Sequence, residues 1–279
     1  MTAKLTVLGC QIDIPLMRTE SERDAHVDRV AQRVDDCLQH RPADIVVLPE
    51  LSTTDYSRHA FEQLNALAEL PDGRSFNVWR EIALRYGCHV VYGFAQALEP
   101  GYTIATAIIN SSGELTAVYH KLHLAQFGDS MEKEYFIVGE RNLVVVDIGG
   151  LRISPIICYD IRSPELCRTL AVDHGVDCIL HTGAYARDPS FFSWHAFATT
   201  RAVENQLYLL SLNRAGQHFG QSVFCPPWID EHHQPVTFDQ HAENFKYLTI
   251  DQGVLQQARD EFTFLKDRLD SYQLPVVGA

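Results

Sequence analysis

The sequence predicts an α/β fold in which helices cover β-sheets, and three observations support this. Strand-like and helix-like segments alternate along almost the entire 279 residues. Several of the strand-like segments are continuously apolar, which is typical of strands buried on both faces. Hydrophobic residues make up 46% of the chain and charged residues 21%, as in an ordinary globular domain. The alternation requires sheets packed against helices, but it leaves open a doubly wound sheet, a barrel or a two-sheet sandwich.

The N-terminal half is predicted to contain two helices and five strands. The first helix, at 21–39, has an apolar face made of Val27, Val30, Ala31, Val34 and Leu38. The second helix starts near Ser75 and ends at Gly87, a residue type that favours helix C-caps. The strands are predicted at 5–12, 44–48, 89–94, 104–110 and 115–120, and a Ser-Ser-Gly turn at 111–113 joins the last two.

The C-terminal half is predicted to repeat this style without repeating the sequence. Ser163 and Pro164 fit the N-cap and first position of a helix that closes at Gly175. Two further helices are predicted at 191–204 and 252–269, and the strands at 143–148, 151–157, 177–181 and 207–212. We expect a single domain over residues 1–279, with 270–279 as a C-terminal tail that extends onto a partner.

Composition limits the possible partners and the compartment. The formal net charge is −13, which argues against binding a nucleic acid or an anionic membrane. No stretch is long and apolar enough to span a bilayer. The N-terminal residues run directly into a strand-like pattern and lack the features of a secretory signal, so the expected location is cytoplasmic.

The cysteines indicate reduced thiols rather than a disulfide framework. There are seven of them, with irregular spacing and no CxxC pair. No pair of cysteine and histidine residues has the tight spacing of a zinc site, so no metal and no cofactor are expected.

Cys158 is the candidate nucleophile because it lies between a strand and a helix start. A thiol there is exposed at the edge of a sheet, where backbone N–H groups and a helix N-terminus favour negative charge. The same N–H groups can stabilise a developing oxyanion. The alternative is that Cys158 is a buried core residue, which is the commoner role of a lone cysteine after a strand.

Two charged residues follow other strands and are candidate partners. Glu50 follows a buried strand, where partial burial would raise its pKa and make it a general base. Lys121 ends another strand, where an ammonium can stabilise a tetrahedral oxyanion. Taken singly, each residue is more commonly an exposed side chain.

Five segments resemble the signature segments of the nitrilase superfamily of carbon–nitrogen hydrolases. Each segment is short, but together they follow the family's order and spacing and extend over essentially the whole chain. They are Leu48–Glu50, Tyr119–Leu124, Ile157–Glu165, the pair Arg201–Gln206 and Asn213–Gly216, and Gly220–Ser222.

This resemblance implies a four-layer αββα sandwich, a homodimer or larger homo-oligomer, and a Glu–Lys–Cys triad. By position, Glu50 matches the general base, Lys121 the oxyanion-stabilising lysine and Cys158 the nucleophile. A second family glutamate falls on Glu132, seven residues before a glycine, with Glu134 as its rival.

The residues after Cys158 are similar to the amidase-like branches, including those that act on ω-amides of dicarboxylic acids. We therefore expect a small-molecule amide as substrate. The backbone N–H of Tyr159 is expected at the oxyanion, and the segment containing His181, Thr182 and Tyr185 is expected to border the substrate. This segment and the loop at 125–131 depart from the family pattern, which indicates a remodelled pocket.

Other functions remain open at this stage. They are nitrile or carbamoyl hydrolysis, acyl transfer to an acceptor other than water, a Cys–His hydrolase that uses one of the thirteen histidines, and a catalytically silent binding member.

Overall fold

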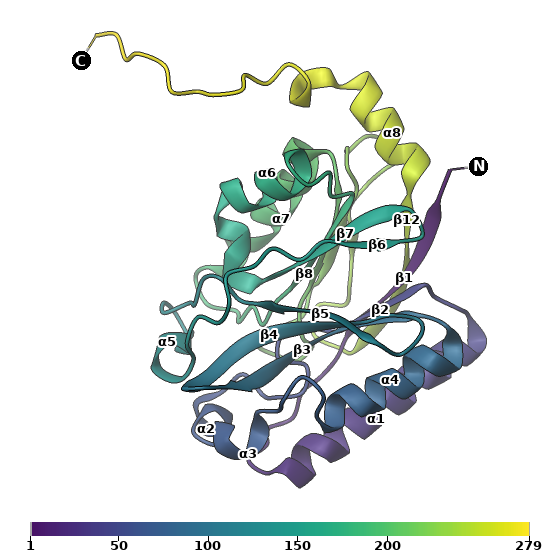
Figure 1. Ribbon diagram of the computed structural model, residues 1–279, viewed down its shortest axis with the longest axis vertical. Coiled ribbons are helices and arrows are strands. Elements are labelled where there is room, and N and C mark those ends of the chain that lie inside the picture. The colour runs from purple at the N-terminus through teal and green to yellow at the C-terminus, as the bar shows by residue number, and fades with distance from the viewer. Residues whose placement is uncertain (1, 279) are drawn as a thin grey trace.

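The computed structural model describes residues 2–278, which form two six-stranded sheets stacked face to face (Figure 1). The first sheet contains β1 (Lys4–Gln11), β2 (Ile45–Val47), β3 (His89–Leu98), β4 (Gly101–Ile109), β5 (Leu115–His120) and β12 (Asn244–Asp251). The second contains β6 (Val146–Ile148), β7 (Leu151–Ile157), β8 (Cys178–Thr182), β9 (Tyr208–Leu212), β10 (Val223–Cys225) and β11 (Val236–Thr237). The strand orders are β12-β1-β2-β3-β4-β5 and β11-β10-β9-β8-β7-β6.

Helices cover the outer face of each sheet. The first sheet is covered by α1 (Glu20–His40) and α4 (Arg74–Tyr86), and the second by α6 (Pro164–Val172) and α7 (Phe191–Asn205) (Figure 1). The four-layer αββα sandwich is therefore confirmed, which removes the doubly wound sheet and the barrel. One apolar cluster lies between the two sheets and contains Val7, Val47, Leu180 and Leu210 from facing strands. Two more clusters lie under the helical layers.

The helix boundaries follow local signals in the sequence. Thr19 and Glu22 form a capping box that satisfies N–H groups at the start of α1. Gly87 ends α4 with a left-handed φ of 62°, which a side chain would strain. Ser163 and Pro164 begin α6 as expected.

Several elements differ from the sequence-based prediction. Strand β12 was not predicted, although it pairs antiparallel with β1 over eight residues and closes one edge of the first sheet. The short elements β10, β11, α2 (Arg58–Phe61), α3 (Leu64–Leu67) and α5 (Glu132–Tyr135) were not predicted either.

The last helix, α8 (Gln252–Glu261), ends well before the expected residue 269. Phe262 is extended there, with φ −116° and ψ 92°, and stacks on Trp228 with ring centroids 3.7 Å apart. This contact directs the chain out of the helix and into the short 3-10 turn η2 (Thr263–Leu265).

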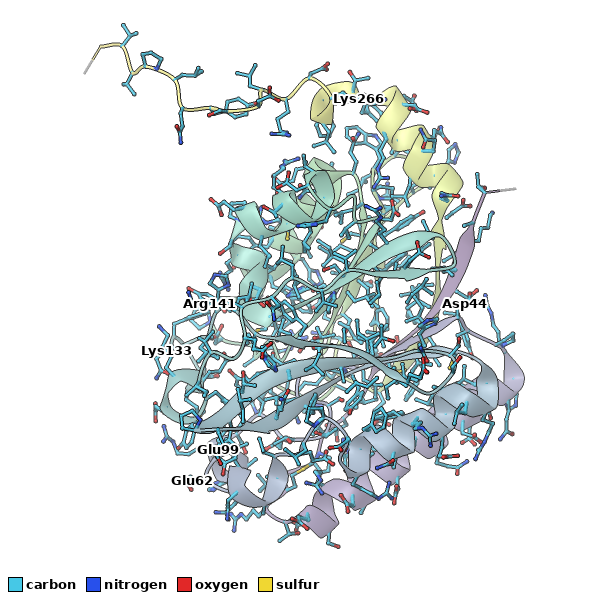
Figure 2. The ribbon with its side chains drawn as sticks, in the orientation of Figure 1. Asp44, Glu62, Glu99, Lys133, Arg141 and Lys266 are labelled. Carbon is cyan, nitrogen blue, oxygen red and sulfur yellow. The ribbon has the colours of Figure 1, made fainter. Side chains whose placement is uncertain are left out.

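Beyond Lys266 the chain forms no helix or strand up to residue 278 and runs away from the body of the molecule (Figures 1 and 2). Its apolar side chains are exposed: Tyr272, Leu274, Val276 and Val277. Among the residues that the structure describes, no helix has the length and apolar character needed to cross a membrane.

Candidate active site

Three strand ends converge on one buried cluster of charged groups beside a thiol. Glu50 follows β2, Lys121 follows β5 and Cys158 follows β7. The ammonium of Lys121 donates to Glu50 Oε1 at 2.7 Å and to Glu132 Oε1 at 2.6 Å. None of these three charged side chains has exposed surface. The structure thus brings Glu50, Lys121, Glu132 and Cys158 together, although they are far apart in sequence.

Glu132 is held by three hydrogen-bond donors. Besides the Lys121 ammonium, its Oε1 accepts the Tyr56 hydroxyl at 2.8 Å, and its Oε2 accepts the Ala125 N–H at 2.8 Å. Glu134 instead lies at the surface, in an ion pair with Arg58. Of the two rival glutamates, only Glu132 contacts the cluster.

The cluster perturbs the ionisation of its own members. Burial raises the pKa of Glu50 to about 7, against the opposing effect of the Lys121 ammonium, while the Glu132 carboxylate raises it further. Burial by itself would lower the pKa of Lys121. The neighbouring Glu132 and Glu50 carboxylates have the larger, opposite effect and hold the lysine pKa well above its usual value. Lys121 is therefore a permanent cation between two acidic groups.

Cys158 differs from the expectation that its surroundings favour a thiolate. Burial, and then the Glu50 carboxylate, raise the pKa of this thiol well above its usual value, although Lys121 and the Ala184 N–H oppose them. The helix N-terminus invoked in the sequence is also not adjacent, because the 3-10 turn η1 (Cys158–Arg162) separates Cys158 from α6. The resting sulfur is thus a thiol, and its proton must leave during reaction.

Cys158 is held in a strained backbone conformation by the turn that it begins. Its φ is 44°, a left-handed value that costs a non-glycine residue about 1–3 kcal/mol. Asp160 secures the turn by accepting the Ile157 N–H at 3.1 Å, the Tyr119 hydroxyl at 2.8 Å and the His123 N–H at 2.9 Å. Such anchoring is needed because an unsupported turn would relax to a less strained φ.

Glu50 also depends on close backbone packing. The residue after it, Leu51, has φ 47°. A Cβ at Gly93 on β3 would lie 2.5 Å from Pro49 O and 2.8 Å from Glu50 Cα, so only glycine allows this approach. Glu50 Oε2 accepts the Ala184 N–H at 2.8 Å, which fixes the second carboxylate oxygen.

The four residues expected at the substrate occupy different environments. Tyr159 and Tyr185 line a pocket that contains Cys158. His181 is fully buried and is not among the residues lining that pocket; it bonds the Cys158 carbonyl instead. Thr182 is buried at the end of β8, and its hydroxyl has no hydrogen-bond partner among the described residues.

The pocket above Cys158 has about 330 Å³ of empty space including its mouth. Arg162 is the only cationic side chain among its described lining residues, and Asp188 is the only acidic one. The Arg162 guanidinium lies 5.2 Å from the centroid of the Phe127 ring and 5.8 Å from that of Tyr159. Apart from Cys158, Tyr159, Arg162, Tyr185 and Asp188, the lining is Ala125, Phe127, Ser130, Ala184, Ala186 and Ser190.

Sequence reasoning did not identify Tyr56, Gly93 or Asp188. Tyr56 lies only six residues after Glu50 in the sequence, but nothing in its local pattern indicates that its hydroxyl contacts Glu132. Gly93 lies inside a strand-like segment, where an isolated glycine is a signal of close backbone approach. That signal could have been used.

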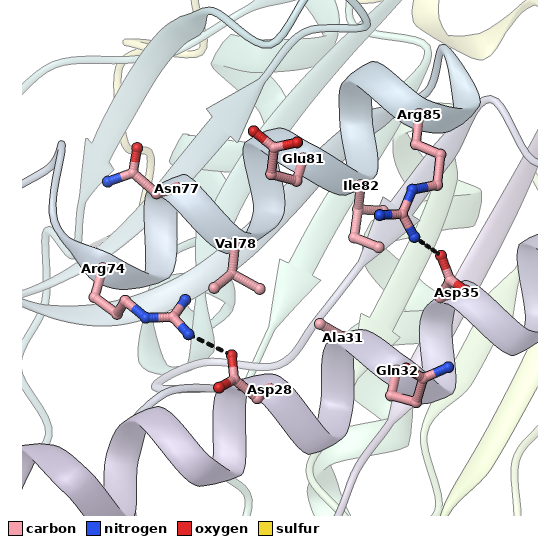
Figure 3. A pocket seen from close by; sticks show the side chains of 10 residues that line it. All are labelled: Asp28, Ala31, Gln32, Asp35, Arg74, Asn77, Val78, Glu81, Ile82 and Arg85. Atoms are coloured by element: carbon pink, nitrogen blue, oxygen red, sulfur yellow. Dashed lines mark hydrogen bonds and ion pairs between the residues drawn. The ribbon is translucent and has the colours of Figure 1, made fainter.

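A second hollow lies elsewhere and carries none of this chemistry. It runs between α1 and α4, and Figure 3 shows two ion pairs across it, Arg74 with Asp28 and Arg85 with Asp35. No residue of the Cys158 cluster lines it. The groove belongs to the outer helical layer and is not the candidate active site.

Comparison with known families assigns the chain to a class. Residues 4–260 match the model of the carbon–nitrogen hydrolase family. The chain belongs to this family, which lies within the nitrilase superfamily, and it is therefore a hydrolase of carbon–nitrogen bonds.

Two curated relatives and one solved structure show which members of the family the chain resembles. The chain is 32% identical to the 2-oxoglutaramate amidase of Bacillus subtilis, over 68% of this chain and 73% of that protein. It is 24% identical to the chloroplastic omega-amidase of Arabidopsis thaliana, over 97% and 74%. Its fold is similar to a CN-hydrolase superfamily protein of Xanthomonas campestris, with TM-score 0.80, 24% identity and coverage of 98% and 100%.

Proposed function

We propose that the protein hydrolyses a small amide to a carboxylate and ammonia through an acyl-enzyme on Cys158. The observation that carries this proposal is the buried ammonium of Lys121, which bridges Glu50 and Glu132 beside a thiol at the base of a pocket. A fully buried cation between two carboxylates is costly to maintain as a structural feature alone. All the groups needed for acyl transfer are also present, which argues against a silent binding member.

In this mechanism Glu50 is the general base. With a pKa of about 7, it is ionised in a large fraction of molecules near neutrality and is still basic enough to accept the thiol proton as Sγ attacks the amide carbon. Lys121 and the Tyr159 N–H stabilise the oxyanion. Glu50 then returns the proton to the nitrogen, ammonia leaves, and the thioester forms. Water activated by Glu50 attacks the thioester, releasing the carboxylate and restoring the thiol.

The roles of the two glutamates differ in this proposal. Glu132 accepts hydrogen bonds from Lys121, Tyr56 and the Ala125 N–H, so its two oxygens are occupied by donors that fix its position. It orients the ammonium. Glu50 accepts Lys121 and the Ala184 N–H and lies beside the Cys158 thiol, and its raised pKa suits proton transfer.

We further propose that the substrate is the ω-amide of a short dicarboxylate. Arg162 forms no ion pair with a described residue, and it is the one cation among the described residues that line the Cys158 pocket. A carboxylate at the far end of the substrate would give this guanidinium a partner of opposite charge. The names of the two amidase relatives, which act on 2-oxoglutaramate and on ω-amides, support the same class.

Ammonia release from glutaramate, the monoamide of glutarate, tests the reaction. Cys158→Ala should abolish release and remove the acyl adduct seen by intact mass, while Cys225→Ala, another buried thiol, should retain both. Retained turnover in Cys158→Ala would overturn the proposal.

A second substrate tests the role of Arg162. Arg162→Met should raise KM for glutaramate at least about tenfold, as expected for loss of a charged hydrogen bond, and should leave KM for the uncharged butyramide nearly unchanged. Equal effects on both amides would refute a carboxylate partner.

We also propose a homo-oligomer in a reducing, cytoplasmic setting. The exposed apolar residues of the tail would be covered by a second copy of the chain, and all seven cysteines are free thiols in the described structure. Light scattering should show a dimer or larger assembly that is weakened by deletion of residues 270–279. An unchanged monomer in both samples would contradict this.

A further inference from the structure

Two buried side chains hydrogen-bond the backbone carbonyl of Cys158, the proposed nucleophile. The Tyr185 hydroxyl donates to Cys158 O at 2.8 Å, and His181 Nε2 lies 3.0 Å from the same oxygen. Both side chains are buried, and His181 has no exposed surface. Because both polar groups hydrogen-bond the main-chain carbonyl of Cys158, they are not free to hydrogen-bond a substrate. Their role therefore concerns the position of the Cys158 peptide group.

A fixed chain of hydrogen bonds sets the direction of the histidine proton. The Cys158 carbonyl oxygen can only accept, so the His181 Nε2 that lies 3.0 Å from it carries the ring proton, and the neutral Nδ1 accepts the Ser211 hydroxyl at 2.7 Å, while Ser211 Oγ accepts the indole N–H of Trp194 at 2.7 Å. The ring therefore donates from Nε2 to Cys158 O, and the Trp194–Ser211 pair supports this tautomer from the other side. Burial lowers the pKa of His181 to about 4, so the ring stays neutral and keeps this tautomer at neutral pH.

The phenol ring of Tyr185 is equally fixed. It stacks on Trp194 with ring centroids 4.5 Å apart and planes 10° apart. Its backbone N–H donates to Asn213 Oδ1 at 2.8 Å, and Asn213 Nδ2 donates back to Tyr185 O at 3.0 Å. Trp194 therefore supports both donors, through the stack and through Ser211.

Holding the Cys158 carbonyl has a consequence on the other side of the same peptide bond. The peptide unit is planar and trans, so the N–H of Tyr159 points opposite to the carbonyl of Cys158. Tyr159 is the second residue of η1, and its N–H has no acceptor within that turn. It is therefore available to a ligand in the pocket.

We propose that His181 and Tyr185 are positioning residues that aim the Tyr159 N–H at the oxyanion by clamping the Cys158 carbonyl. The pair acts through the peptide plane and never contacts the reacting atoms with its polar groups. The inference rests on the proposed acyl transfer at Cys158.

Two reactions of the same thiol separate this role from a purely structural one. Amide hydrolysis passes through an oxyanion, whereas alkylation of Cys158 by iodoacetamide does not. Tyr185→Phe keeps the stacked ring and removes only the hydroxyl. It should lower kcat for glutaramate roughly 10- to 100-fold, somewhat less than loss of an oxyanion donor itself, with little change in KM. The rate of Cys158 alkylation and its pH profile should stay at wild-type values.

His181 supplies a matched pair of variants. Gln can place an N–H near the position of Nε2, so His181→Gln should retain most of the activity, whereas His181→Leu, of similar size but without a donor, should lose it. Tyr208→Phe is the control, because Tyr208 is also a buried, stacked tyrosine, paired with Phe224, and lies outside the clamp.

The outcomes separate the two proposals. Wild-type kcat in Tyr185→Phe would overturn the clamp, as would a parallel loss of hydrolysis and alkylation, since that indicates damage to the thiol site itself. If Tyr185→Phe does not fold, equal activity in the two His181 variants would overturn it. Retained turnover in Cys158→Ala would instead remove the proposed function, whatever the clamp variants show.

Discussion

Replacing Glu132 with Gln tests how the buried charges divide their work. The substitution keeps the size of the side chain and removes one negative charge from beside Lys121. In the wild-type site the Glu132 carboxylate raises the pKa of Glu50, while the Lys121 ammonium lowers it. The variant should therefore make Glu50 a weaker base, because the opposing cation remains and the supporting anion is gone.

The geometry gives the size of this effect. Glu50 Oε1 and Glu132 Oε1 lie 2.7 Å and 2.6 Å from Lys121 Nζ, so these two oxygens are about 5 Å apart at most. At an effective dielectric constant of about 20, two unit charges at that distance repel by about 3 kcal/mol, or roughly two pKa units. In the variant, movement of Lys121 towards Glu50 and entry of water would change part of this interaction energy. We therefore expect the pKa of Glu50 to fall by about one to two pKa units.

The assay is the pH dependence of kcat/KM for ammonia release from glutaramate between about pH 4.5 and 9. Glu50 must be ionised to accept the thiol proton, so wild-type activity should rise with pH through a midpoint near 7. Glu132→Gln should move this midpoint to lower pH and lower the plateau about 10- to 100-fold, since the base is weaker and the ammonium less well held.

Glu134→Gln is the matched control. Glu134 carries the same charge on the same short helix, but it faces Arg58 at the surface, so neither midpoint nor plateau should change. The charge argument fails if the Glu132→Gln midpoint stays at the wild-type value or moves to higher pH.

The remaining predictions concern other parts of the same site. Lys121→Met should destabilise the fold by about 3–5 kcal/mol in chemical denaturation, because two buried carboxylates lose their cation; unchanged stability would contradict the burial argument. Gly93→Ala should lower kcat more than tenfold and destabilise by about 1–3 kcal/mol, since the new Cβ meets the Glu50 backbone, and wild-type kinetics would show that the strand can yield. Tyr56→Phe should cost about 1 kcal/mol and reduce kcat modestly; a loss as large as that of Glu132→Gln would mean that the hydroxyl has a role in the chemistry.

Most of the sandwich could be predicted because its strands are apolar and its helices amphipathic. The segment at 244–251 escaped this reasoning, although it forms strand β12. Its partial burial is the cause: Tyr247 faces α1, where its hydroxyl donates to Cys37 O at 2.7 Å, and Lys246 is half-buried, with its ammonium donating to Thr237 O. An edge strand with aromatic residues on one face and basic and aliphatic residues on the other lacks the clear alternation of apolar and polar residues that predicts a half-buried strand.

The convergence of Glu50, Lys121 and Cys158 could be expected, because residues that follow strands gather at one rim and the family resemblance named these positions. The ionisation of the thiol could not. Its raised pKa depends on burial and on the nearby Glu50 carboxylate, and both come from tertiary packing. The expected helix N-terminus is not adjacent to Cys158, because the 3-10 turn η1 lies between them. This turn could not be recognised from the sequence, since the same segment also fits the start of α6.

The site shows how two identical residue types acquire different tasks around one cation. Glu50 and Glu132 bond the same ammonium at nearly equal distances, so Lys121 alone cannot distinguish them. The distinction comes from the kind of donor: Glu132 also accepts the Tyr56 hydroxyl and a loop N–H, whereas Glu50 accepts the Ala184 N–H and lies beside the Cys158 thiol. A carboxylate held by groups that keep their protons is suited to orient the lysine, and one beside the reacting thiol with a raised pKa is suited to take up its proton. Since these donors arrive from loops distant in sequence, the assignment of base and positioning group requires the folded structure.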